Sequence, residues 1–351
     1  MIQQSKTVFV LGAGFTKAFL PDAPLLVDNY NLDPLLEKYK HFDIAFRLLK
    51  QERDRYKQRI NIERLLTRLD GMPFDRDDAS FQFGQLKQDV HNLFVDRLGQ
   101  AKAKGDHLED LGRFARYCVE KGIKCITFNY DDVLDKALWE VKKLLDGKPY
   151  WHPNGGYGVF LRPSDSTIGD TPWASLRNTS MLLLKLHGSI NWRVKLGFSK
   201  PYSLDAIVHH SRWGSEQYNA EPVEHAIESH LTNEMFIVPP VLAKSSLEEP
   251  ILQQIWGKAY LALHDADEVV FVGYSCPITD LAVNFLFSEA IFFERPRVTV
   301  VNKVESERDQ ERLKAAYRNA FPNIQDSQFQ FRDALEWARE LVADDHQATL
   351  G

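Results

Sequence analysis

Three segments of this chain each end a short apolar run in small or polar residues, and they constrain its fold more than any other feature. They are Val8–Thr16 (VFVLGAGFT), Ile126–Asp131 (ITFNYD) and Leu184–Ser189 (LKLHGS). Such runs are typical of buried strands. In an open parallel sheet the carboxyl ends of the strands line one crevice, where ligands bind. We therefore expect a phosphate-binding turn, an amide side chain and a titratable ring around one nucleotide.

Length and composition allow a sizeable core and exclude a broad nucleic-acid surface. The chain has 351 residues, of which 44% are hydrophobic and 12% aromatic, enough for one large α/β domain or two modest ones. Its net charge of -6 provides no basic field over the molecule. We expect no direct binding to nucleic acid.

Cysteine usage and the N-terminus indicate a cytoplasmic protein without a metal. The three cysteines, Cys118, Cys125 and Cys276, form no C-x-x-C pair, so they cannot build a four-cysteine zinc module. The chain enters an apolar strand at once, with no basic and then apolar leader segment. No apolar stretch approaches the roughly 20 residues that a membrane helix needs.

Apolar runs alternate with helical patterns along most of the chain, which predicts a doubly wound parallel sheet of the α/β class. The predicted strands are Thr7–Leu11, Ile123–Phe128, Met181–Leu186, Met235–Val238, Glu268–Gly273 and Val298–Asn302. The predicted helices begin near Gly14 and Asp131 and cover about Leu247–His264, Thr279–Phe292, Glu305–Ala320 and Arg332–Val342.

Two segments are too long for ordinary connections between strands. Residues 31–122 have a helical pattern throughout, and we interpret them as an inserted helical subdomain. Residues 147–233 are rich in proline and glycine at their start and poorly periodic later, which predicts a loop-rich small lobe. The main domain would then cover residues 1–320, with a C-terminal helical extension at 321–351.

The turn Gly12-Ala13-Gly14 has two interpretations that the sequence leaves open. Glycines between a strand and a helix let backbone N–H groups approach a phosphate. They also permit a tight turn that only packing requires. Lys17 stands where the third glycine of a full G-x-G-x-x-G pattern would be, so the motif is incomplete.

Polar residues after the later strands are candidates for the crevice. Asn129 and Asp131 could cap the following helix, but Asn129 stands where it can point into the crevice. His187 follows an apolar run and precedes a glycine, and an ordinary pKa of about 6.5 suits a general base. Ser275 could donate to a phosphate and Asn302 to a ribose hydroxyl, whereas Asp280 is expected to cap its helix.

The order of these motifs resembles the sirtuin-like (silent information regulator type) family. The motifs G-A-G, T-x-N-x-D, L-H-G-S, G-x-S and V-N occur here as Gly12–Gly14, Thr127–Asp131, Leu186–Ser189, Gly273–Ser275 and Val301-Asn302. Each motif alone is weak, but five in order at successive strand ends are more specific.

Three further segments resemble the bacterial defence branch of that family more than its protein deacylases. They are Asn61-Ile62-Glu63, the Phe-Asn-Tyr-Asp form of the second motif, and Ile237–Pro240. The deacylases carry a four-cysteine zinc module and continue their first turn as G-I-P-D-F-R. This chain cannot build the module, and Phe15–Pro24 contains no arginine.

The resemblance implies an enzyme that cleaves NAD to ADP-ribose and nicotinamide, as an NAD-depleting effector of antiphage defence, with NAD as its substrate and no metal. It implies Asn129, Asp131 and His187 as catalytic residues. It implies cofactor contacts by Gly12, Ala13, Gly14, Phe15, Thr16, Gly273, Ser275 and Asn302.

The resemblance also implies control of the activity, because unregulated loss of NAD would kill the host. We expect a homo-oligomer or a defence partner, such as a translocase ATPase, an Argonaute-like protein or a phage component, with residues 31–122 as the contact surface. The alternatives are a zinc-free deacylase or ADP-ribosyltransferase, and a sensor that binds NAD or ADP-ribose without turnover.

Overall fold

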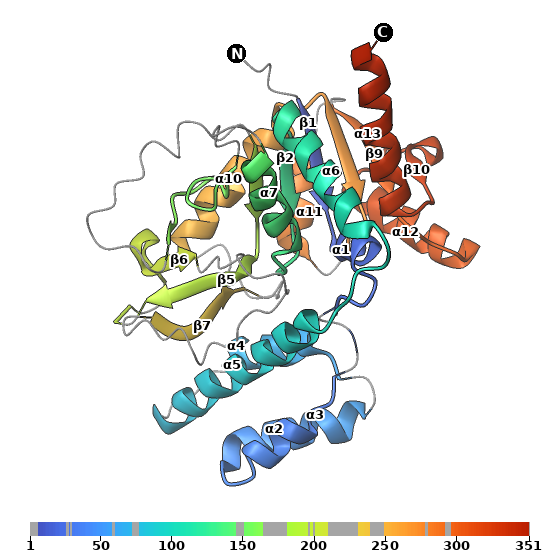
Figure 1. Ribbon diagram of the computed structural model, residues 1–351. Helices are drawn as coiled ribbons and strands as arrows, with labels where there is room; N and C mark the ends of the chain where they lie inside the picture. Colours follow the sequence, from blue (N-terminus) through green and yellow to red (C-terminus); the bar gives the residue numbers. More distant parts are fainter. Residues whose placement is uncertain are drawn as a thin grey trace.

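The computed structural model describes residues 6–25, 28, 30–57, 60–71, 77–144, 151–163, 181–195, 197–198, 201–209, 231–238, 249–277, 280–291 and 296–350. A six-stranded parallel sheet lies at its centre (Figure 1). Its strands, in spatial order, are β10 (Phe329–Gln330), β9 (Arg297–Val301), β8 (Glu268–Val272), β1 (Thr7–Leu11), β2 (Lys124–Thr127) and β4 (Leu182–Lys185).

The sheet has two halves, and in each half successive strands of the chain lie progressively farther from the centre of the sheet. One half runs from β1 through β2 to β4, and the other from β8 through β9 to β10. The order reverses between β1 and β8, where Leu11 pairs with Val272. Such a reversal opens a crevice at the carboxyl ends of the strands. The predicted doubly wound α/β fold is confirmed.

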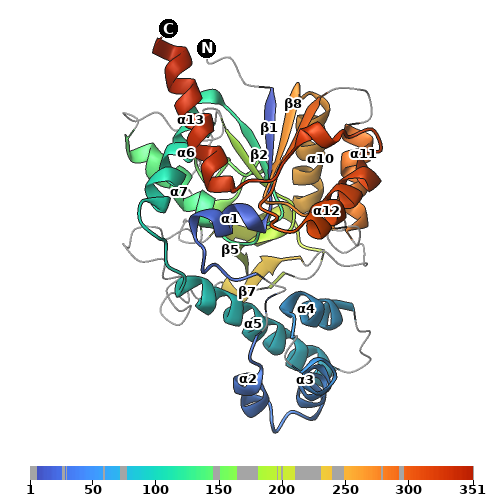
Figure 2. The ribbon, with the colours of Figure 1, turned by 90° about the vertical axis from the view of Figure 1, so that its right-hand side faces the viewer.

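Helices cover both faces of the sheet (Figure 2). One face carries α1 (Ala13–Phe19), α6 (His107–Lys121), α7 (Val133–Leu144) and α13 (Ala334–Leu350), and the other carries α10 (Pro250–His264), α11 (Leu281–Ala290) and α12 (Glu307–Ala320). Aromatic side chains fill both interfaces. The ring of Phe9 in β1 lies 5.2 Å from Trp337, and the ring of Phe271 in β8 lies 5.0 Å from Phe287.

Four helices of the predicted insertion lie together at the carboxyl end of the sheet (Figure 1). They are α2 (Asp33–Lys38), α3 (Asp43–Tyr56), α4 (Ile62–Gly71) and α5 (Asp77–Gly99). A buried carboxylate joins two of them, because Glu52 of α3 accepts hydrogen bonds from Arg64 and Arg68 of α4 at 2.7 and 2.8 Å. The last helix before β2 is placed differently. α6 packs beside the sheet against α7 and α13, and Asp110 of α6 accepts from Arg339 of α13 at 2.6 Å.

A second, smaller sheet is formed by strands that lie between β2 and β8 in the chain. Its spatial order is β3 (Arg162–Pro163), β6 (Ile207–His209), β5 (Gly188–Lys195) and β7 (Leu231–Ile237). The strand predicted at Met235–Val238 begins earlier than expected and pairs antiparallel with β5, so it does not belong to the parallel sheet. The sequence analysis did not predict β5, although polar and apolar residues alternate along Ser189–Lys195 as in a half-buried strand. In the structure both sets of side chains are buried, except for Lys195 at the end of the strand. Much of the predicted lobe at 147–233, and the proline pair after β7, lie outside the described residues.

None of the helices in the described ranges is both long and apolar enough to cross a membrane.

A substitution at Gly273 tests whether the chain after β8 packs against the chain after β1. The Gly273 backbone has φ +61°, and an added Cβ would lie 2.2 Å from the backbone nitrogen of Phe15. We expect Gly273→Ala to lower the free energy of unfolding by about 2–3 kcal/mol, measured by urea denaturation.

The matched control is Gly112→Ala in α6, where an added Cβ meets nothing within 4 Å. It should raise the free energy of unfolding by about 1 kcal/mol, since alanine has the higher helix propensity. Equal stability of Gly273→Ala and the natural protein would contradict the described approach of the two strand ends.

Candidate functional site

A cavity of about 520 Å³ lies at the carboxyl ends of β1, β2, β4 and β8. This volume is within the range of small-molecule sites, about 300–1,000 Å³. Pro24, Leu25, Glu63 of α4 and Phe94 of α5 also line it, so the inserted helices contribute to its walls. Nearly all the predicted site residues meet here: Gly12, Ala13, Gly14, Asn129, Asp131, His187, Gly273, Ser275 and Asn302 line the cavity.

Phe15 and Thr16, which were predicted to contact the cofactor, are buried and do not line the cavity. The ring of Phe15 lies in the core, 5.0 Å from the ring of Phe19 and 5.2 Å from that of Phe114. Thr16 is buried and bonds to other site residues. Neither side chain is among those that line the cavity.

The glycine turn is bonded to the end of β8. The N–H of Gly12 donates to the carbonyl of Val272 at 3.0 Å, and the N–H of Gly14 donates to the carbonyl of Gly273 at 2.9 Å. A Cβ added to Gly12 would lie 2.5 Å from the carbonyl oxygen of Gly273, and one added to Gly14 would lie 2.8 Å from the same oxygen. Packing therefore accounts for both glycines, and the phosphate-binding role of this turn stays a prediction.

The side chain of Asn129 is held in one orientation by two acceptors. Its Nδ2 donates to the carbonyl of Gly12 at 2.9 Å and to Oγ1 of Thr16 at 3.0 Å. The Thr16 hydroxyl uses its own hydrogen toward Oδ2 of Asp131 at 2.9 Å, so it can only accept from Asn129. Among the described residues Oδ1 of Asn129 has no hydrogen-bond donor. It can therefore accept from a ligand or a water in the cavity.

Asp131 connects this chain of hydrogen bonds to the helix that follows. Its Oδ1 accepts from the N–H of Val133 at 3.2 Å, so the predicted capping interaction is present as well. Burial raises the pKa of Asp131 to about 6, against the opposing effects of the Lys185 charge and the Thr16 hydrogen bond.

The buried ion pair between Lys185 and Asp135 lies beside the ends of β2 and β4. Lys185 of β4 donates to the carbonyl of Asp131 and pairs with Oδ2 of Asp135 at 3.1 Å. Tyr157 donates to the same carboxylate and accepts from Nδ2 of Asn191 in β5 at 3.0 Å. The second sheet is thereby joined to the loop that carries Asn129.

His187 lies among aromatic rings at the end of β4. Its ring centroid is 5.5 Å from that of Phe128 and 6.1 Å from that of Tyr130. Only 3% of the residue is exposed, and burial lowers the pKa of His187 to about 4. The expected value near 6.5 is therefore wrong for this environment. The ring is neutral at pH 7, with its lone pair available, but burial makes it a weaker base than an ordinary histidine.

Two carboxyl groups that sequence reasoning did not place in the site also line the cavity. Asp280 caps α11 as expected, with Oδ1 accepting from the N–H of Val283 at 3.3 Å. Its Oδ2 lies 3.9 Å from Nε2 of His187, and burial raises the pKa of Asp280 to about 6. Glu63 enters from α4, and its pKa is raised by burial and then by Asp280. No local pattern could have placed Glu63 here, because its position depends on how the insertion packs.

On the opposite side of the cavity, Asn302 supports the loop after β8. Its Nδ2 donates to the carbonyl of Tyr274 at 2.9 Å, and the hydroxyl of Tyr317 donates to the same oxygen at 2.9 Å. Ser275 is exposed at the rim. These residues fix the backbone on the β8 side of the crevice.

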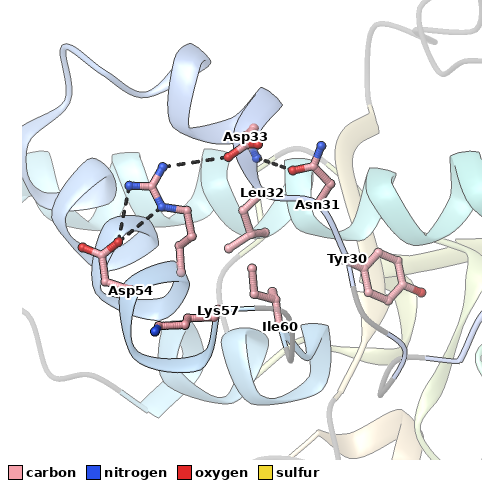
Figure 3. A pocket seen from close by; sticks show the side chains of 8 residues that line it. Tyr30, Asn31, Leu32, Asp33, Asp54, Lys57 and Ile60 are labelled. Carbon is pink, nitrogen blue, oxygen red and sulfur yellow. Dashed lines mark hydrogen bonds and ion pairs between the residues drawn. The ribbon is translucent and has the colours of Figure 1, made fainter.

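A second cavity, about 680 Å³, lies within the insertion (Figure 3). Three of its charged side chains pair with one another: Arg53 contacts Oδ1 of Asp54 at 3.3 Å and Oδ1 of Asp33 at 3.9 Å. None of the predicted site residues lines it. We assign no function to it.

Fold and site together define a doubly wound α/β protein with a ligand-sized cavity at its switch point. No family model and no curated protein matches the chain. Several Sir2 proteins are among the solved structures that resemble it. One is Sir2 with the inhibitor EX-527, 2′-O-acetyl-ADP-ribose and a deacetylated p53 peptide, at 14% identity, 97% coverage of this chain, 94% of that chain and a TM-score of 0.42. Another is a Sir2 homologue in complex with NAD, at 14% identity and a TM-score of 0.46. The match covers 99% of this chain and 92% of that chain. Such low values assign no ligand or activity to this chain.

The hydrogen bonds from Asn129 to Thr16 and from Thr16 to Asp131 predict that the Thr16 hydroxyl contributes to the stability of the protein. Thr16→Val leaves a buried donor and a buried acceptor without a partner and should lower the free energy of unfolding by about 1–3 kcal/mol. Thr16→Ser keeps the hydroxyl and is the control, with a smaller loss. Equal losses in the two variants, measured by urea denaturation, would show that the hydroxyl contributes nothing.

The raised pKa of Asp280 predicts a pH-dependent stability. Its value of about 6 in the folded state lies above the ordinary 3.8, so the folded state binds this proton more tightly than the unfolded state. The contribution of Asp280 to the free energy of unfolding therefore falls by about 1–3 kcal/mol as the pH rises from about 4 to about 6.

Asp280→Asn keeps a good helix cap and removes this titration. Urea denaturation at pH 4, 5, 6 and 7 should show the natural protein losing stability relative to the variant as pH increases. A difference that stays constant, or that changes in the opposite direction, would contradict the buried position of this carboxyl group.

Proposed function

We propose that this protein is an NAD glycohydrolase, which cleaves NAD to ADP-ribose and nicotinamide. The observation that carries the proposal is the meeting of Asn129 and His187 in one cavity at the switch point of the sheet. The two residues follow different strands, and each presents an acceptor that the described structure does not use. A crevice of this kind is where dinucleotides bind in doubly wound sheets.

The reaction breaks the bond between C1′ of the ribose and the pyridinium nitrogen. The bonding electron pair leaves with nicotinamide, which departs as a neutral molecule and needs no acid. The ribose passes through an oxocarbenium-like state. A water molecule then adds its oxygen to C1′, and its proton must be removed. The enzyme therefore needs to orient the ribose, stabilise a cation and accept one proton.

The site residues fit these tasks. Neutral His187 accepts the proton from the attacking water or from a ribose hydroxyl. Asn129 presents Oδ1 to the same water or hydroxyl, because its Nδ2 is held by Gly12 and Thr16. Asp131 fixes this orientation through Thr16, and we propose it as a positioning residue.

The remainder of the dinucleotide would lie along the β1 and β8 ends. We propose that Gly12, Ala13 and Gly14 face its phosphates, and that Gly273, Ser275 and Asn302 contact the adenosine half. Phe15 and Thr16 would act from behind the wall, through packing and through Asn129. NAD is the substrate in this proposal, and no step is assigned to a metal.

We further propose that the activity is controlled in antiphage defence. The inserted helices α4 and α5 supply walls of the cavity, so a contact on the insertion can change access to it. A second copy of the chain, a translocase ATPase, an Argonaute-like protein or a phage component would act in this way.

The proposal predicts release of nicotinamide from NAD by the purified full chain, measured by chromatography, without any peptide acceptor. Turnover should be measured over a wide range of protein concentration, so that an effect of self-association would be detected. His187→Ala and Asn129→Ala should each lower the rate about 10²–10⁴-fold, since each removes a group that acts on the transferred proton or the water.

His264→Ala is the matched control, because this histidine is exposed at the end of α10. It should keep the natural rate. Full activity of His187→Ala would contradict the proposal. Tight binding of NAD without any product would instead favour the sensor, and turnover only with an acyl peptide or acceptor protein would favour the deacylase or transferase.

A further inference from the structure

Glu63 is the carboxyl group that the inserted helices contribute to the cavity lining. It stands in the first turn of α4, whose start is capped by Asn61: Oδ1 of Asn61 accepts from the N–H of Arg64 at 3.1 Å. The Glu63 side chain lines the cavity together with His187 and Asp280. Within the described part of the chain it has no hydrogen bond and no ion pair.

The neighbouring cation does not neutralise Glu63. Arg64 donates from Nε to Glu52 at 2.7 Å, and its guanidinium lies 3.5 Å from the ring centroid of Tyr56. Arg68 of the same helix also pairs with Glu52. Glu52, which is 0% exposed, thus has two arginine partners, whereas Glu63 has none among the described residues.

Asp280 stands across from Glu63 with one oxygen still available. Its Oδ1 caps α11, and its Oδ2 is 3.9 Å from Nε2 of His187, too far for a hydrogen bond. His187 itself has no hydrogen bond at either ring nitrogen within the described ranges, although 97% of it is buried. Burial and the mutual repulsion of Glu63 and Asp280 both disfavour the ionised carboxyl groups, so the pKa of Glu63 is raised. A cation in the cavity would relieve that repulsion.

Helix electrostatics alone do not explain this placement. A glutamate in the first turn interacts favourably with the helix dipole. That interaction is available to an exposed side chain as well, and it does not require burial beside a second carboxyl group. Unpaired carboxyl groups that face a cavity are more typical of ligand sites.

Building on the proposed NAD cleavage, we propose that the carboxyl pair Glu63–Asp280 selects the cationic pyridinium ring of oxidised NAD over the neutral ring of NADH. The two dinucleotides have nearly the same shape and differ in this one charge. When the bond to C1′ breaks, the positive charge moves from the ring to the ribose and stays beside the same carboxylates. The pair would therefore favour both the oxidised substrate and the cationic state that follows.

The test is to measure dissociation constants of NAD and NADH for the full chain by calorimetry at pH 7.5. We expect the natural protein to bind NAD at least about tenfold more tightly than NADH. Glu63→Gln should lower this ratio about tenfold, mainly by weakening NAD, because one charge is lost at similar shape. Glu63→Asp keeps the charge and should retain most of the ratio.

Two further variants separate charge selection from folding. Glu37→Gln changes an exposed glutamate of the insertion and should leave the ratio unchanged. Asp280→Asn should lower the ratio as Glu63→Gln does, and it provides the measurement if Glu63→Gln fails to fold.

The outcomes distinguish this inference from the proposed function. Equal ratios in the natural protein, Glu63→Gln and Asp280→Asn would overturn the charge selection, even if NAD is cleaved. A ratio that falls in both variants would support it, even if no nicotinamide is released. Failure to bind either dinucleotide would overturn both proposals.

Discussion

The close approach of two backbones at the centre of the sheet is the constraint on which the rest of this structure depends. Gly12 and Gly14, after β1, donate hydrogen bonds to Val272 and Gly273, at the end of β8. A side chain at either donor position would overlap the β8 backbone. Because β1 and β8 belong to opposite halves of the sheet, this contact brings two sets of strand ends to one crevice. The candidate site is built around it.

Polar networks of two kinds support the crevice. Asn129 donates to Thr16 and to the carbonyl of Gly12, and Thr16 donates to Asp131, so these neighbours orient the side chain of Asn129. The Lys185–Asp135 pair lies deeper and is nearly inaccessible to solvent. Buried charges are stable only when they are paired and hydrogen-bonded. Glu63 has no ion pair and the ring of His187 no hydrogen bond within the described part of the chain, and both residues line the cavity.

Much of the parallel sheet was predictable, and the reasons differ between its elements. Strands such as Thr7–Leu11 are buried on both faces and are flanked by glycine or polar residues, so each forms a distinct apolar run. β5 is also buried, but polar residues such as Asn191 and Arg193 alternate with its apolar ones, and it begins at Gly188, whose φ is +78°, close behind the end of β4. A run of residues does not reveal which sheet it joins. The pairing of β5 with β7 comes from contacts between residues far apart in the chain, from 36 positions for Lys195 with Leu231 to 49 positions for Gly188 with Ile237.

The sequence by itself determined which residues stand at the strand ends, because glycine, asparagine and histidine interrupt apolar runs at those positions. Asn129 and His187 could be named from that pattern alone. Only the tertiary structure decided their environment. Burial among Phe128 and Tyr130 lowers the pKa of His187, and the packing of α4 over the crevice brings Glu63 to Asp280. Desolvation and charge–charge interaction depend on distances between segments that are remote in the chain, and local sequence carries no record of those distances.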